Sequence, residues 1–184
     1  MKLIKAVVVA ITAVSLAGCS AAATPAAAKP VPAVASSVPM QVVPSAVGTT
    51  LTVHTQTGQA VSITLLKVDP KAVSLQSQDD ATVGNRYYAA QLRYTNPGKV
   101  TYTAITANNG ASLTDTQGQQ YTLNPSGQIN ALSSGPQLQA SLNIPAGGSI
   151  TGWLLFVFPT SAHIVQVQIA GDMGLTDAGT WKVA

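Results

Sequence analysis

Residues suited to acid–base catalysis are scarce in this sequence. Glutamate is absent, histidine occurs twice, and charged residues make up only 8% of the 184 positions. His54 lies on a polar strand face with Thr52, which predicts a solvated side chain, whereas His163 shares a face with Val165 and Val167, which predicts a partly buried ring. No nucleophile-elbow pattern marks a catalytic serine. Because hydrolytic chemistry depends most often on histidine or on a carboxylate pair, we expect no catalytic residue and no enzymatic activity.

Cysteine occurs once, at position 19, which excludes a disulfide within the chain and a zinc site built from several thiolates. The aspartates offer few metal ligands in its place. Asp79 and Asp80 form the one acidic doublet, which is more typical of an exposed turn than of a calcium site with about six to eight oxygen ligands. Asp115, in TDTQGQ, is expected to accept hydrogen bonds from its own following backbone. We therefore predict no metal ion and no cofactor.

Positive charge is also limited once the amino terminus is set aside. The chain carries nine lysines and arginines against six aspartates, a net charge of +3, and Lys2 and Lys5 are two of the nine. Without these two residues the charges nearly balance, and no cluster of basic residues remains. Because nucleic-acid binding requires such a cluster, we expect no nucleic-acid partner.

The first 18 residues have the layout of a secretory signal peptide. Lys2 and Lys5 form a positive start, and the apolar run AVVVAITAVSLA follows them and stops at Gly18. A membrane-spanning helix needs about 20 apolar residues, and no basic flank follows this run. Removal of residues 1–18 is therefore favoured over a permanent membrane span.

The segment Leu16-Ala17-Gly18-Cys19 resembles the lipobox of bacterial lipoproteins. The resemblance implies that the thiol of Cys19 receives a diacylglyceryl group and that the chain is cut before Cys19, which becomes the mature amino terminus. Two acyl chains give stable membrane attachment, whereas one anchors only marginally. The alternative is an unpaired thiol after an ordinary signal, which is unusual in a secreted protein. We expect a lipid anchor at Cys19 on the extracytoplasmic face of the cell membrane.

Residues 19–48 are dominated by alanine, proline, serine and valine, with Lys29 as the only charged residue. The repeated prolines remove backbone donors and disfavour helix at the residues before them. This composition predicts a disordered and partly extended linker, which reaches up to about 3.1 Å per residue. Such a linker would hold the folded part away from the bilayer, across cell-wall material.

From residue 49 to residue 184 the pattern changes to short segments in which apolar and polar side chains alternate. The alternation is clear at residues 61–65, 88–94, 138–144 and 165–169. Residues 150–158, ITGWLLFVF, are apolar on both faces and predict a central strand covered on each side. Turn sequences such as NPG at 96–98 and PAGG at 145–148 separate the strands. Roughly eight or nine strands without a helix predict an all-β fold, an antiparallel sandwich or barrel.

Three segments of this domain carry a family resemblance. They are YAAQLRYTNPGK at 88–99, LTDTQGQQY at 113–121 and IPAGGSITGWLLFVFP at 144–159. Taken in order, they resemble an immunoglobulin-like extracellular family of bacteria, the DUF4352 group, which includes the mycobacterial MPT63-type secreted antigens. The resemblance covers nearly all of the domain, and the chain departs from it in the glutamine- and threonine-rich stretch 117–122. It implies an immunoglobulin-like β-sandwich outside the cytoplasm, with no catalytic residues to transfer.

Aromatic residues are the remaining candidates for a binding surface. Tyr87 and Arg93 fall on one face of a predicted strand, opposite Tyr88, and would form a patch able to stack sugars or to hold a protein. Trp153 is expected in the core, and the burial of Trp181 is left open. The sequence assigns no ligand-binding residue beyond this.

We expect a lipid-anchored surface protein whose domain is a non-catalytic binding or structural module, with the membrane as one partner and a protein or the cell wall as another. Two alternatives stay open. One is a cell-wall carbohydrate-binding module that uses exposed aromatic side chains. The other is an inhibitor of an extracellular hydrolase that acts through loop residues such as 124–136.

Overall fold

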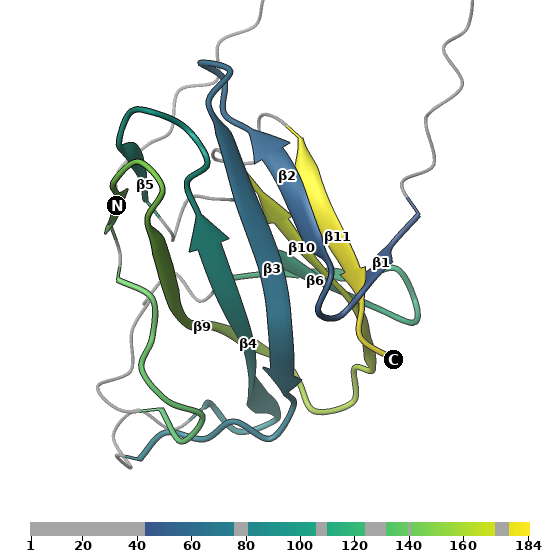
Figure 1. Cartoon of the computed structure of the whole chain (residues 1–184). Helices are drawn as coiled ribbons and strands as arrows, with labels where there is room; N and C mark the ends of the chain where they lie inside the picture. Colours follow the sequence, from purple (N-terminus) through teal and green to yellow (C-terminus); the bar gives the residue numbers. More distant parts are fainter. Residues whose placement is uncertain (1–42, 76–80, 106–109, 124–131, 140, 172–176) are drawn as a thin grey trace, which may run out of the picture. The chain divides into compact units, whose positions relative to one another are not determined.

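A computed structural model of the chain describes residues 43–75, 81–105, 110–123, 132–139, 141–171 and 177–184. These residues form eleven β-strands and include no helix long and apolar enough to span a membrane (Figure 1). The strands are β1 (Ser45–Ala46), β2 (Thr50–His54), β3 (Ala60–Asp69), β4 (Asn85–Thr95), β5 (Tyr102–Ile105), β6 (Ser112–Asp115), β7 (Gln120–Thr122), β8 (Ser141–Ile144), β9 (Ser149–Pro159), β10 (Ile164–Ala170) and β11 (Ala178–Lys182). The sequence predicted roughly eight or nine strands, fewer than are found. Two of the eleven, β1 and β7, have only two and three residues and leave almost no periodic signal.

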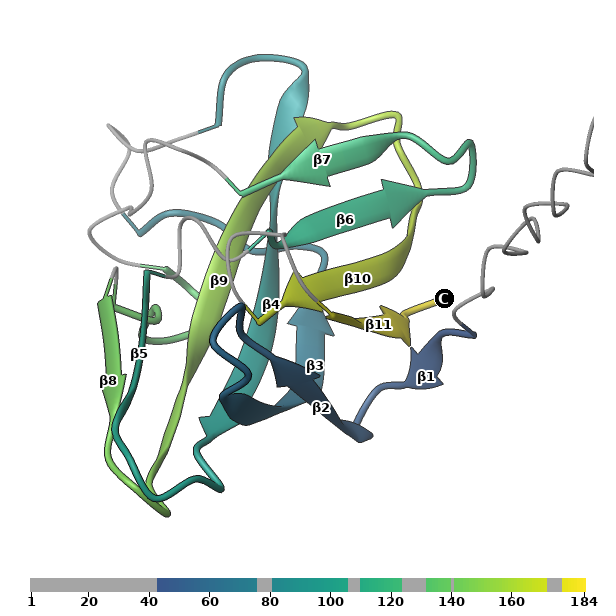
Figure 2. The same ribbon diagram turned by 90° about the horizontal axis from the view of Figure 1, so that it is seen from above.

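Two sheets pack face to face to form the domain. The five-stranded sheet has the order β1-β11-β10-β6-β7, the four-stranded sheet has the order β2-β3-β4-β9, and β5 pairs with β8 as a separate ribbon. The pairings are antiparallel, apart from that of β1 with β11, which is parallel. Seen from above, the two sheets form two layers (Figure 2). The predicted all-β antiparallel sandwich is confirmed.

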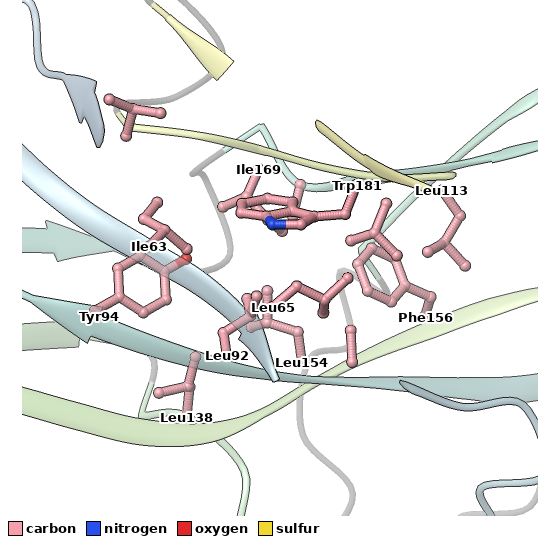
Figure 3. Packing of buried hydrophobic residues seen from close by; sticks show 14 of the residues in the cluster. Ile63, Leu65, Leu92, Tyr94, Leu113, Leu138, Leu154, Phe156, Ile169 and Trp181 are labelled. Carbon is pink, nitrogen blue, oxygen red and sulfur yellow. The ribbon is translucent and has the colours of Figure 1, made fainter. Parts of the chain in front are cut away.

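The hydrophobic core lies between the two sheets and is filled by every second side chain of their strands (Figure 3). Leu65 of β3 and Leu92 of β4 meet Ile169 of β10 and Trp181 of β11, and all four side chains are fully buried. The indole Nε1 of Trp181 donates a hydrogen bond of 2.9 Å to the carbonyl oxygen of Thr49, so its polar atom is satisfied. Truncation of a buried tryptophan to alanine costs about 3–5 kcal/mol. Trp181, whose burial the sequence left open, is therefore a main stabilising residue of the core.

Strand β9 is apolar on both faces, as predicted, but it is not a central strand. It is the last strand of the four-stranded sheet. Phe156 points into the core, whereas Trp153 on the opposite face is covered by residues 132–139. The same residues cover the edge of β9, because the Leu138 amide donates to the Trp153 carbonyl at 2.9 Å and the Trp153 amide donates to the Pro136 carbonyl at 3.1 Å. β9 therefore has the apolar composition of an interior strand although it lies at the edge of its sheet, because this one loop covers both its outer face and its edge.

The folded part begins before residue 49. Ser45–Ala46, which the sequence placed in the linker, form β1 and pair with Trp181 and Lys182 of β11. Both ends of the described domain therefore lie on the same side of the five-stranded sheet (Figure 1). Residues 1–42, with the predicted signal peptide and Cys19, lie outside the described residues.

Candidate functional site

The outer face of the four-stranded sheet, which is turned away from the core, is divided into two halves of different chemistry. Near the connection from β3 to β4 it carries a small apolar cluster that includes Tyr87, Ala89, Trp153 and Leu155. At the other end, towards the turn from β2 to β3, most of the side chains on this face carry hydroxyls. One half is covered by the chain and the other is open to solvent.

The covering segment, residues 132–139, is called the strap here. Leu132 is buried in the apolar cluster, and Gly135 packs so closely on Trp153 that a Cβ at this position would lie 3.0 Å from the indole Nε1. Gly135 also has a φ of +129°, which side chains other than glycine rarely adopt. The hydroxyl of Ser134 donates to Asp69 of β3 and fixes the strap to the sheet. The strap encloses Trp153 and removes its indole from the surface.

The open half is called the hydroxyl face. Its members come from four neighbouring strands: Thr50 and Thr52 (β2), Ser62 and Thr64 (β3), Arg93 and Thr95 (β4), and Ser149 and Thr151 (β9). They stand in two rows across the sheet, because Thr50 pairs with Thr64 and Thr64 with Arg93, and the second row follows two residues along each strand. The register shift between β3 and β4 lies between Leu65 and Lys67, beyond these rows. The hydroxyl face is therefore a regular grid with a strand spacing of about 4.8 Å.

Neighbouring side chains of the hydroxyl face bond to one another. The contacts are Thr50 Oγ1 to Thr64 Oγ1 at 2.7 Å, Thr52 Oγ1 to Ser62 Oγ at 3.4 Å, and Arg93 Nε to Thr151 Oγ1 at 3.5 Å. Five of the eight residues are exposed and three are partly buried. Each hydroxyl donates once and accepts twice, so these contacts leave acceptor positions open to solvent. Arg93 is the only charged member.

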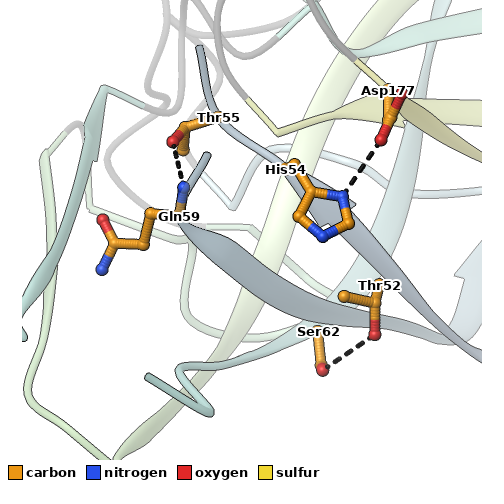
Figure 4. A network of polar contacts seen from close by, with 6 residues as sticks. All are labelled: Thr52, His54, Thr55, Gln59, Ser62 and Asp177. Carbon is orange, nitrogen blue, oxygen red and sulfur yellow. Dashed lines mark hydrogen bonds and ion pairs between the residues drawn. The ribbon is translucent and has the colours of Figure 1, made fainter. Parts of the chain in front are cut away.

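His54 lies beside the hydroxyl face at the end of β2, and its Nδ1 is 3.1 Å from Asp177 Oδ2 (Figure 4). The two side chains are 51% and 70% exposed, which confirms the solvated position predicted for His54. The nearby hydroxyls of Thr52 and Ser62 bond to each other rather than to the imidazole. In the part of the chain that the structure describes, Asp177 is the hydrogen-bond partner of the His54 imidazole. The pair is exposed, and no serine among the described residues joins it in a Ser-His-Asp arrangement.

The structure contradicts the burial predicted for His163 and confirms the turn contacts predicted for Asp115. His163 is exposed rather than partly buried, because it precedes β10 at the end of a turn instead of lying within the strand. Asp115 is buried and accepts hydrogen bonds of 2.9 Å from the amides of Gln117 and Gln119, as predicted. It also accepts a hydrogen bond of 2.9 Å from the Tyr121 hydroxyl. Asp115 therefore stabilises the turn from β6 to β7.

The pKa of the Asp115 carboxyl reflects two opposing effects. Loss of solvent raises it, while the hydrogen bonds from Tyr121 and from the following backbone amides lower it by more. The net result is a pKa below the ordinary value. The pKa of Tyr121 is raised, first by loss of solvent and then by the hydrogen bond to the carboxylate. This pair is a local structural contact between a charged acceptor and a neutral donor.

The aromatic patch predicted from the sequence does not form. Tyr87 is buried, 7% exposed, because its face of β4 at that end lies under the apolar cluster, and it is separated from the open position of Arg93. Of the nine aromatic residues of the chain, eight are buried, and the ninth, Tyr121, is partly buried and bonded to Asp115. Trp153 is buried, as expected, although in the outer cluster rather than in the main core. No exposed aromatic platform is available for stacking.

Several residues singled out in the sequence lie in segments that the structure does not describe. Asp79 and Asp80 lie outside the described residues, as do Cys19 and residues 124–131 of the proposed inhibitory loop. Among the residues that are described, no three histidine, cysteine, aspartate or glutamate side chains come together as a possible metal site. The hydroxyl face was missed by sequence reasoning. Its signal was a serine or threonine repeated at every second position, as in Thr50 and Thr52.

Comparisons with known proteins identify the family and the fold. Residues 54–179 match the family described as "Domain of unknown function (DUF4352)". The crystal structure of MPT63, a secreted protein from Mycobacterium tuberculosis, aligns with a TM-score of 0.52 at 17% identity, over 76% of this chain and 96% of that one. The yjhA protein from Bacillus subtilis aligns with a TM-score of 0.50 at 14% identity, over 76% of this chain and 99% of that one. None of the curated proteins matches the chain. At these identities the structural matches show the fold alone.

Proposed function

The chain belongs to the DUF4352 family, and from this premise we propose that it is a lipid-anchored protein of the bacterial cell surface whose immunoglobulin-like sandwich is a non-catalytic binding or structural module. The observation that carries the proposal is the order of the parts: a signal-like segment over residues 1–18, Cys19 directly after it, a proline-rich stretch, and a sandwich that starts at β1. MPT63, which shares the fold, is a secreted protein.

The length of the proline-rich stretch supports a tethered rather than a membrane-bound domain. The 24 residues from Cys19 to position 42 would reach about 70 Å if extended as a polyproline-type segment. This is more than twice the thickness of a hydrocarbon core, about 30 Å. The sandwich would therefore move through the layer of wall material next to the membrane while it stays attached.

The chemistry of the domain favours binding over catalysis. The exposed pair of His54 and Asp177 is open to solvent, and the aromatic side chains are committed to packing. The strap residues that overlap the proposed inhibitory loop pack on Trp153, so this part of the loop is not free to enter the active site of a hydrolase. The hydroxyl face is a polar surface that this sheet leaves open to solvent, and it is the binding surface we assign to the module.

Membrane fractionation tests the anchor. We expect the wild-type chain in the membrane fraction, labelled by radioactive palmitate, and accumulation of an unprocessed precursor when the lipoprotein signal peptidase is inhibited with globomycin. Cys19→Ala removes the acylated thiol, so neither acylation nor cleavage at this site should occur. Ser20→Ala, one position further, is the matched control and should behave as wild type.

Unchanged processing and unchanged acylation of Cys19→Ala would refute the lipid anchor. Membrane retention on its own is not decisive for that variant, because an uncleaved signal segment also holds a chain at the membrane. Acylation and the size of the processed chain are therefore the measurements that count.

A further inference from the structure

The hydroxyl face brings hydroxyl side chains from four neighbouring strands side by side. Seven of the eight residues of this face are serine or threonine, and Arg93 is the one charged residue among them. The face also has no apolar or aromatic anchor of the kind on which protein–protein hot spots depend. Its chemistry is that of a dense, nearly neutral layer of hydroxyl donors and acceptors.

Such a layer is complementary to a polymer that carries the same groups. A polyanion such as nucleic acid needs several cations, and this face supplies one. A glycan presents many hydroxyl and acetamido groups, each of which can donate to or accept from a serine or threonine hydroxyl. Arg93, at the centre of one row between Thr64 and Thr151, adds charge-assisted hydrogen bonds to a carboxylate or carbonyl oxygen of the polymer.

We propose that the hydroxyl face binds the glycan strands of the cell wall. The choice of a glycan as occupant rests on the proposed function, because a tether of about 70 Å from a lipid anchor at Cys19 holds the sandwich within the wall layer. It also rests on the shape of the face, since four strands in continuous register give an unbroken grid for an extended chain to lie across. Sugar binding here works through hydrogen bonds and not through the aromatic stacking that the sequence suggested.

Co-sedimentation with purified peptidoglycan sacculi, freed of proteins and attached polymers, tests the proposal. The full chain, solubilised from membranes in a non-ionic detergent, is compared with a variant that combines Thr50→Val, Thr64→Val and Arg93→Gln. Valine keeps the branched shape and strand preference of threonine, so the fold is preserved. The matched control combines Thr103→Val and Thr122→Val, two exposed strand threonines of β5 and β7.

We expect the wild type and the control to sediment with sacculi to the same extent and the hydroxyl-face variant to bind at least about tenfold more weakly, because several hydrogen bonds to the glycan are lost. Binding should change little between low and high salt, since one cation is involved. Soluble fragments from a muramidase digest should compete. Equal circular dichroism spectra and urea midpoints of the three chains establish that the variants are folded.

The proposal that the hydroxyl face binds glycan is refuted if the wild-type chain does not sediment with the sacculi, or if the hydroxyl-face variant sediments like wild type. It is also refuted if the chain is retained only on crude sacculi that still carry proteins, because this result would indicate a protein partner. The anchor is scored separately, by acylation of Cys19. If the chain is acylated but does not bind sacculi, the glycan-binding proposal alone is refuted. If the chain binds sacculi but is not acylated, the proposed lipid anchor alone is refuted.

Discussion

Asn96 closes the turn after β4, and its replacement by alanine should be among the more damaging polar substitutions in the domain. The side chain is fully buried. Its Nδ2 donates to the carbonyl oxygens of Val100 at 2.8 Å and Ile144 at 2.9 Å, and its Oδ1 accepts from the amide of Gly98 at 3.0 Å. One side chain therefore links the end of β4, the following loop and the end of β8.

The magnitude follows from these three contacts. A protein hydrogen bond contributes about 0.5–1.5 kcal/mol net, and a buried partner left without one costs about 1–3 kcal/mol. Val100 is exposed, so water can replace its lost donor, whereas Ile144 is buried. We expect Asn96→Ala to lower the free energy of unfolding by about 2–4 kcal/mol. Urea denaturation followed by tryptophan fluorescence measures this change, with Pro97→Ala, an exposed neighbour, as the control.

Asn96→Asp adds a pH dependence of known sign. The carboxylate would face two carbonyl oxygens, so the pKa of the new group is raised in the folded state above its unfolded value of about 3.9. Because the pKa is raised in the folded state, the contribution of this group to stability is fully present at pH values below the unfolded pKa. It is lost as the pH rises through the folded pKa. The deficit relative to wild type should therefore grow from pH 3 to pH 7. A loss below about 1 kcal/mol for Asn96→Ala, or a pH-independent deficit for Asn96→Asp, would refute the reasoning.

Three further predictions concern other parts of the domain. Gly152→Ala places a Cβ 2.9 Å from the amide nitrogen of Leu138, so it should displace the strap from β9. We expect it to lower the free energy of unfolding by about 1–3 kcal/mol and to lower the thermal midpoint, and an unchanged midpoint would contradict this. The pKa of the Asp115 carboxyl is lower in the folded state than in the unfolded state, so its stabilising effect is present at pH values above the unfolded pKa and is lost as the pH falls. The difference in urea midpoint between wild type and Asp115→Asn should therefore shrink from pH 7 to pH 3. A difference that stays constant over this range would contradict the prediction. His54→Ala changes an exposed pair and should alter the free energy of unfolding, measured by urea denaturation, by no more than about 0.5 kcal/mol, whereas a larger loss would show that the pair is structural.

The parts of the fold that sequence reasoning predicted depend on neighbours within one strand. Alternation in β3 and β10 follows from one face being buried, and it is visible without knowledge of any partner. The turn role of Asp115 is equally local, because the amides that donate to its carboxylate belong to residues two and four positions later. Such features need no information about distant segments, and for that reason they were predicted correctly.

The parts that were missed depend on segments far apart in the chain. Tyr87 was expected to be exposed, but the residues that cover its face include Leu132, 45 positions later. The hydroxyl face exists only because four strands align in one register, and each strand alone shows no more than a pair of serines or threonines. Register and coverage are set by the tertiary fold, so periodicity within a single strand cannot reveal them.

The parallel pairing of β1 with β11 has a mechanical consequence if the domain is held at Cys19 while its sheet is bound elsewhere. Tension along the linker then reaches β1 first, and this strand pairs through only Ser45 and Ala46. Its release would free residues 43–47, which span up to roughly 17 Å when extended. The pull would next meet Gly48, whose amide donates to the carbonyl of Leu65 at 2.7 Å, and then Thr49, whose carbonyl accepts from the indole of Trp181. The short first strand would thus act as a slack segment that yields before the sandwich does.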